Sequence, residues 1–164
     1  MISAQFRTIR RFGMTLLAIA ISLGTVSMHA QSAESPNGLT GTWHVQVTLH
    51  NCATGVQIGP AFQSILSFQR GGTMSGTTTN PAFQVGQRTP DFGKWSQDSG
   101  QNYAAVSEAY VLFTGGPFVR GTQRLTQAIH VDGDTFDSVA SVQFFDASQN
   151  LVTAGCANAT GTRF

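Results

Sequence analysis

The residues best suited to chemistry lie in the segment "YAAVSEAYVLF", residues 103–113. Glu108 and Tyr110 point to the same side of this segment if it is an extended strand, because side chains alternate between the two faces. Both faces are largely apolar, so we expect both to be covered and Glu108 to be poorly solvated. A buried carboxylate is costly without a partner, and Arg120, Arg124 or a tyrosine hydroxyl could serve.

Two interpretations of Glu108 and Tyr110 remain open. In the first, they form a polar anchor or an acid/base group inside a cavity, since poorly solvated carboxylates in clefts are often functional. In the second, Glu108 pairs with an arginine on the wall of the fold and has a structural role. We predict a ligand-binding role for both residues and assign no catalytic residue.

Other parts of the chain lack the spacing of a catalytic or metal site. His44 and His50 share a strand face, but at about 3.3 Å per residue they stand some 20 Å apart, too far to bind one metal ion. The segment "DGDTFD" lacks the twelve-residue loop of a calcium site, and "GGTMSG" lacks the lysine and helix of a phosphate loop. We therefore predict no metal and no cofactor, and we favour a role other than catalysis.

Residues 1–30 are typical of a secretory signal peptide. Arginines precede the apolar run "MTLLAIAISLGTV", which is shorter than the roughly 18 residues needed to span a membrane. Small residues follow, and cleavage after Ala30 or after Ser32 fits the pattern. An uncleaved anchor is the alternative, but no stable membrane span is expected once the signal peptide has been removed.

The part of the chain after the predicted signal peptide divides into a tether and a domain, which together are nearly neutral in charge. Residues 31–40, "QSAESPNGLT", predict a disordered tether, and residues 41–164 predict a single domain. From residue 31 onward, six Lys and Arg residues stand against eight Asp and Glu residues. Such a chain offers no basic stripe to a phosphate backbone, so we do not expect it to bind nucleic acid. The pattern does not specify an oligomeric state.

The chain contains two cysteines, Cys52 and Cys156, and both lie in the part predicted to be exported. A disulfide is the usual state of such a pair in an oxidising compartment. Two free buried thiols are the alternative. The pair and the leader together predict a secreted or periplasmic protein with one disulfide.

The domain alternates apolar and polar residues between turn signals, which predicts consecutive β-strands. In the first run, for example, Trp43, Val45, Val47 and Leu49 share one face. The eight expected strands are residues 41–50, 61–70, 73–79, 93–97, 101–115, 120–131, 135–147 and 151–164. Eight antiparallel strands with short links can close into an up-and-down barrel, whose interior holds packed side chains or one small ligand. A β-sandwich is the alternative fold.

The longest expected link, residues 80–92, contains two prolines and no sustained alternation. It also carries apolar residues, which suggests that it folds over another part of the domain. We expect it to cover the open end of the barrel, with Phe83 and Phe92 near the mouth of a ligand site.

The first expected strand begins with Gly41-Thr42-Trp43, and Arg163 lies at the end of the last one. This pattern resembles the lipocalins and the wider calycin group of β-barrels. In those proteins the tryptophan of a Gly-x-Trp motif seals the closed end of the barrel and a basic residue lies across its indole. The resemblance implies these structural roles for Gly41, Trp43 and Arg163. The order of elements is similar to that of small exported bacterial lipocalin-like proteins of unassigned function.

The expected barrel and its many aromatic residues predict a binding module. The leading hypothesis is that one small hydrophobic or amphipathic ligand enters the open end and contacts Glu108, Tyr110, Phe83 and Phe92, since pockets of this kind are mostly apolar with a few polar groups. An isomerase- or cyclase-type enzyme on the same barrel is one alternative, by analogy of fold. A packed structural or interaction barrel without a ligand is another.

Overall fold

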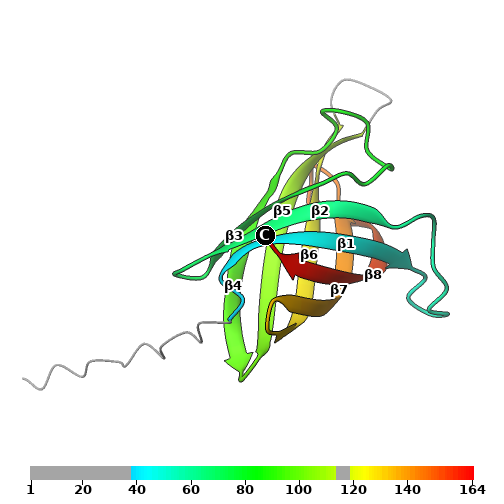
Figure 1. Ribbon diagram of the computed structural model, residues 1–164. Helices are drawn as coiled ribbons and strands as arrows, with labels where there is room; N and C mark the ends of the chain where they lie inside the picture. The colour runs from blue at the N-terminus through cyan, green and yellow to red at the C-terminus, as the bar shows by residue number, and fades with distance from the viewer. Residues whose placement is uncertain (1–37, 114–118) are drawn as a thin grey trace, which may run out of the picture. The chain divides into compact units, whose positions relative to one another are not determined.

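The computed structural model describes residues 38–113 and 119–164, which form eight consecutive strands (Figure 1). The strands are β1 (Gly41–His50), β2 (Phe62–Gln69), β3 (Thr73–Thr78), β4 (Asp91–Ser99), β5 (Asn102–Phe113), β6 (Val119–Asp132), β7 (Thr135–Phe145) and β8 (Leu151–Arg163). Each strand pairs antiparallel with the next, and β1 pairs with β8, so the sheet closes on itself. The predicted eight-stranded up-and-down barrel is confirmed, and the β-sandwich is excluded.

The seam between β1 and β8 is secured at both ends. Its register runs from Trp43 opposite Arg163 to His50 opposite Cys156. Cys156 of that second pair also forms a disulfide with Cys52, which lies just after β1, and the two Cα atoms are 5.2 Å apart. The predicted disulfide is therefore confirmed, and it joins the first strand to the last.

The period-two pattern of the sequence sorts side chains between the interior and the surface. On β1, Trp43 and Val45 are buried, whereas His44 and Gln46 are exposed. The inward-facing residues build an aromatic-rich core, whose largest fully buried members include Trp43, Tyr103, Phe68 and Phe136. The edge of Phe136 packs on Trp43, with ring centroids 5.1 Å apart. Large aromatic side chains therefore fill the end of the barrel that contains Trp43, and they close it.

A clamp centred on Arg163 covers the closed end. The guanidinium carbon of Arg163 lies 4.2 Å from the centroid of the Trp43 ring, a cation–π geometry. Arg163 Nη1 donates to the carbonyl of Thr40 at 2.7 Å, and Nη2 donates to the carbonyl of Gly38 at 2.9 Å. The Trp43 indole N–H donates to the carbonyl of Leu39 at 2.9 Å. One side chain from the last strand thus holds both the indole and the chain that enters β1.

Gly41 is required by this clamp for two reasons. Its φ of +133° lies in a region that residues with a side chain rarely adopt. A Cβ atom at this position would also lie 2.9 Å from Nη1 of Arg163. Gly41, Trp43 and Arg163 therefore have the arrangement that the resemblance to lipocalins implies, and the barrel is consistent with a lipocalin-like fold.

The end of the predicted tether belongs to the fold. Leu39 is fully buried, and the carbonyls of residues 38–40 accept the hydrogen bonds of the clamp. The sequence pattern missed this because a short polar segment gives no sign of a distant arginine. The predicted signal peptide, residues 1–30, and residues 31–37 of the tether lie outside the described residues. Within residues 38–113 and 119–164, there is no helix long and apolar enough to cross a membrane.

Candidate functional site

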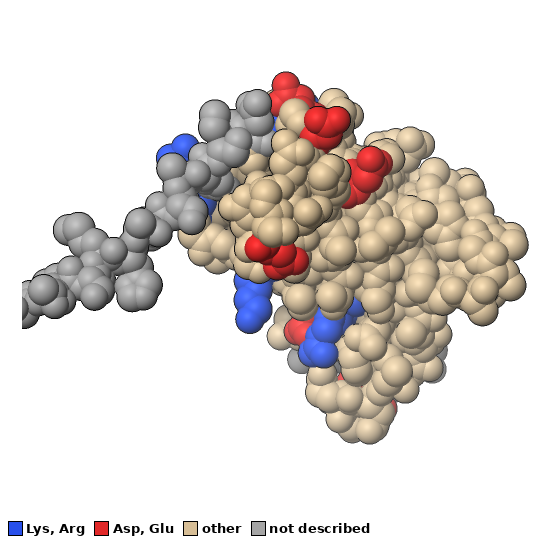
Figure 2. Space-filling model, turned by 90° about the horizontal axis from the view of Figure 1, so that it is seen from below, with Lys and Arg blue, Asp and Glu red and all other residues tan. Residues whose placement is uncertain are grey.

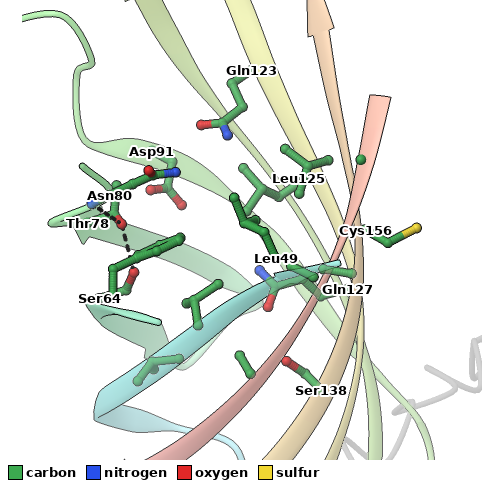
Figure 3. Close-up of a pocket in the computed structure, with 18 of the residues that line it drawn as sticks. Leu49, Ser64, Thr78, Asn80, Asp91, Gln123, Leu125, Gln127, Ser138 and Cys156 are labelled. Atoms are coloured by element: carbon green, nitrogen blue, oxygen red, sulfur yellow. Dashed lines mark hydrogen bonds between the residues drawn. The ribbon is translucent and has the colours of Figure 1, made fainter. Parts of the chain in front are cut away.

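A cavity of about 190 Å³ lies inside the barrel, between the aromatic core and the open end (Figure 3). Its walls come from the inner faces of several strands together with the links at the open end, and most of them are apolar. Val45 and Val47 of β1, Leu66 of β2, Leu125 of β6 and Val142 of β7 contribute aliphatic surface. The lining also includes Ile58, which is half exposed, so the cavity reaches solvent at this end.

A buried polar cluster centred on Arg88 interrupts the apolar lining. Arg88 Nη2 lies 3.0 Å from Oδ1 of Asp91, and the two side chains are only 6% and 5% exposed. Arg88 Nε donates to Oε1 of Gln123 at 2.6 Å, and Nη1 donates to the carbonyl of Thr89 at 3.1 Å. An ion pair this deeply buried depends on such additional hydrogen bonds, because each charge has lost its water.

The segment before β4 places Arg88 in the cavity by running beside β5 as a further stretch of extended chain. The Thr89 N–H donates to the carbonyl of Tyr110, the Leu112 N–H donates to the carbonyl of Gln87, and Arg88 forms a bridge with Val111. Val111 is buried, so its bridge partner also faces inward.

A glycine on the neighbouring strand makes room for the carboxylate of Asp91. A Cβ atom at Gly76 would lie 2.9 Å from Oδ2 of Asp91 and 2.6 Å from a methyl carbon of Leu66. Asp91 and Gly76 are also paired across β3 and β4. A larger residue at position 76 would therefore push Asp91 away from Arg88.

Two further buried polar side chains line the cavity. Gln127 of β6 and Ser138 of β7 are each 6% exposed, and Figure 3 shows the Gln127 amide pointing into the cavity. Among the described residues, Oγ of Ser138 has no hydrogen-bond partner. Buried polar groups are normally hydrogen-bonded, so the Ser138 hydroxyl lacks a partner in the protein, and the Gln127 amide faces a molecule inside the cavity.

The structure does not bring the sequence-predicted site residues together. Phe83 lines the cavity and packs near Phe144 of β7, with ring centroids 6.4 Å apart. Glu108, Tyr110 and Phe92 lie on the outer face of the barrel, and Tyr110 and Phe92 are both 67% exposed. Phe92 is the second residue of β4 and alternates with the inward-facing Asp91, so it does not belong to the loop over the mouth.

The orientation of β5 explains where Glu108 lies. The strand turns its small residues, including Ala105, Ser107 and Ala109, toward the interior. Its other face, which carries Glu108, therefore points outward. Arg124, the neighbour of Glu108 on β6, places Nη2 2.6 Å from Oε1 of Glu108, and both side chains are about half exposed. Glu108 is therefore paired with an arginine on the wall of the barrel, as the second of the two interpretations expected.

Sequence reasoning missed Arg88, Asp91, Gln123 and Gln127. One signal for the glutamines was present: both fall in phase with the apolar residues of residues 120–131, which indicates buried amides. No comparable signal exists for Arg88 and Asp91, because the segment before β4 has no sustained alternation.

The open end is surrounded by exposed aliphatic side chains. Val56 and Ile58 lie in the β1–β2 link, Val85 lies in the link after β3, and Leu151 and Val152 begin β8. In Figure 2 the charged side chains gather on the left of the visible face, while the right, where the β1–β2 link lies in Figure 1, carries none. Residues 51–61 of this link contain no Asp, Glu, Lys or Arg. The approach to the cavity is therefore apolar.

The chemistry that this site offers is hydrogen bonding within an apolar enclosure. Arg88 and Asp91 are bonded to each other, and the amides and the hydroxyl can both donate and accept. No group of three or more His, Cys, Asp or Glu residues in the described parts of the chain has the geometry to hold a metal ion. The arrangement suits the capture and orientation of a small molecule.

Comparisons of the chain with protein-family models, with curated proteins and with solved structures find no match. Any assignment of function must therefore come from the geometry of the barrel and its cavity.

Proposed function

We propose that this protein is an exported, lipocalin-like barrel that binds one small amphipathic molecule in its interior. The observation that carries the proposal is the cavity of about 190 Å³, which combines apolar walls with a few buried polar side chains. Ligand pockets typically have this composition. A barrel with a structural role alone has no need of an interior cavity or of unpartnered polar groups that face it.

The size of the cavity limits the size of the ligand. An engineered cavity of about 150 Å³ in another protein accommodates benzene, and pockets for drug-sized molecules span about 300–1,000 Å³. A cavity of about 190 Å³ therefore suits one ring or a short chain, and a long fatty acid would extend out of it through the open end. The aliphatic rim at the open end supports entry of an apolar molecule from that side.

The disulfide and the leader support the location. A Cys52–Cys156 bond is compatible with an oxidising compartment outside the cytosol. The leader pattern of residues 1–30 predicts export to the same kind of compartment. The clamp formed by Gly41, Trp43 and Arg163 supports the lipocalin-like assignment.

The test compares the wild type with two phenylalanine variants on opposite faces of the barrel wall. Ala140 lines the cavity between Gln127 and Ala157, whereas Ala128 is exposed on the outer face of β6. We expect Ala140→Phe to fill the cavity and abolish ligand binding, and Ala128→Phe to preserve it. Native mass spectrometry of protein purified from its own host would identify a bound molecule and would also give the oligomeric state.

The outcomes separate clearly. If neither a co-purified molecule nor any member of a panel of single-ring compounds binds to the wild type, the proposed function is wrong. If both variants bind ligand as the wild type does, the ligand lies outside the cavity and the site assignment is wrong.

A further inference from the structure

The charges inside the cavity compensate each other. Arg88 and Asp91 are the cavity-lining residues of fixed charge, and they form a buried ion pair of opposite sign. We propose that the cavity selects an uncharged ligand, about the size of one six-membered ring, that carries a hydrogen-bonding group such as a hydroxyl or an amide. This inference rests on the proposed function and specifies the class of molecule bound.

An ionised ligand has no charge partner in this cavity. A carboxylate close to Arg88 would also meet the carboxylate of Asp91, and an ammonium close to Asp91 would meet the guanidinium of Arg88. The two groups are 3.0 Å apart, so a ligand cannot approach one without the other. Transfer of an unpaired charge from water to an apolar enclosure is very costly. Ions are therefore rejected although the cavity contains an arginine.

A neutral polar group, by contrast, finds partners in the same space. The Gln127 amide has both donors and an acceptor, is 6% exposed and is aimed into the cavity. Gln123 gives its oxygen to Arg88, which leaves its amide N–H groups for an acceptor on the ligand. Ser138, whose Oγ has no hydrogen-bond partner among the described residues, adds a hydroxyl. A hydroxyl or amide on the ligand would satisfy these groups, which a hydrocarbon would leave without a hydrogen bond.

The first experiment measures the affinity of the wild type for a matched series built on one ring: toluene, benzyl alcohol, benzamide, benzoate and benzylammonium. Calorimetry at about pH 7 is suitable, because the carboxylate of benzoate and the ammonium of benzylammonium are both almost fully ionised at that pH. We expect benzyl alcohol and benzamide to bind most tightly. Benzoate and benzylammonium should bind more weakly by about tenfold or more, because each would bury an unpaired charge.

Two variants probe the groups that carry the selection. Asp91→Asn leaves Arg88 without its counter-charge, so benzoate should gain affinity by about tenfold or more relative to the wild type. Asp137→Asn makes the same change on the exposed outer face of β7, and we expect it to leave the ranking unchanged. Gln127→Leu should weaken benzyl alcohol and benzamide but not toluene, and it tests the inference even if Asp91→Asn does not fold.

The results distinguish this inference from the proposed function. If no member of the series binds, toluene included, the proposed function itself fails. If the series binds but benzoate or benzylammonium binds as tightly as the neutral polar compounds, the cavity is a binding site and the selection of uncharged ligands is refuted. If Gln127→Leu weakens all members equally, the amide does not recognise the polar group and the inference is also refuted.

Discussion

Removal of the Cys52–Cys156 disulfide should destabilise the barrel strongly. The two cysteines are 104 positions apart, so the bond closes a loop that contains most of the domain. A closed loop of about 100 residues restricts the unfolded chain enough to stabilise the native state by about 4.7 kcal/mol in the chain-entropy model. A domain of ordinary stability has about 5–15 kcal/mol in total. The bond therefore accounts for about a third of that stability or more.

The assay is equilibrium unfolding in guanidinium chloride, followed by circular dichroism, for the wild type and for Cys52→Ala/Cys156→Ala. We expect a loss of about 4 kcal/mol and a steeper dependence on denaturant, because the unfolded chain without the bond is more expanded and exposes more surface. The wild type unfolded in the presence of a reductant should match the double variant.

The result that would refute this reasoning is a loss below about 1 kcal/mol with an unchanged dependence on denaturant, in a wild type whose disulfide has been verified by mass. Such a result would mean that the bond does not act through the unfolded chain. The single variant Cys52→Ala provides a control. Replacement of either cysteine removes the bond, so this variant should lose as much free energy of unfolding as the double variant.

Three further predictions concern single side chains. Arg163→Met should lower the free energy of unfolding by about 3 kcal/mol, because it removes the hydrogen bonds to the carbonyls of Thr40 and Gly38, the partly exposed ion pair with Asp134 and the cation–π contact with Trp43. A chemical denaturation experiment that finds less than about 1 kcal/mol would contradict the clamp. Glu108→Gln should change stability by less than about 1 kcal/mol and leave ligand affinity unaltered, since its ion pair is half exposed and outside the barrel. The pKa of Asp146 should lie below the usual 3.8, chiefly because the side chain of Asn150 donates a hydrogen bond to it. Its stabilising contribution is therefore present above the unfolded-state pKa and is lost as the pH falls through the lower folded-state value, and an NMR titration with a midpoint at or above 3.8 would contradict this.

The fold could be predicted from the sequence because strands carry a local signal. Alternation over β1, with Trp43 and Val45 on one face, depends only on neighbouring residues. The turns after β2 and β6 are marked by glycines with positive φ, such as Gly71 and Gly133. The order of strands then follows from short antiparallel links, and the closure agrees with the paired cysteines.

The site was harder to predict because it depends on which face of each strand points inward. Both faces of β5 are apolar enough to be buried, so composition could not show that Glu108 lies outside. Arg88 is positioned by backbone pairing with β5, and no local pattern in the segment between β3 and β4 predicts that pairing. Small residues such as Gly155 and Ala157 line the cavity, and their positions beside Val142 and Ala140 depend on the register between β7 and β8.

The clamp on Arg163 has a consequence for how the chain reaches its native state. The guanidinium bonds a carbonyl 123 positions earlier in the sequence, so the seam cannot form until nearly all of the intervening chain is present. Contacts between such distant parts of a chain make folding slow. Consecutive strands can pair as soon as both are present, but one edge of β1 has no partner until β8 is present. The contact that completes the barrel therefore also sets the earliest moment at which the barrel can exist.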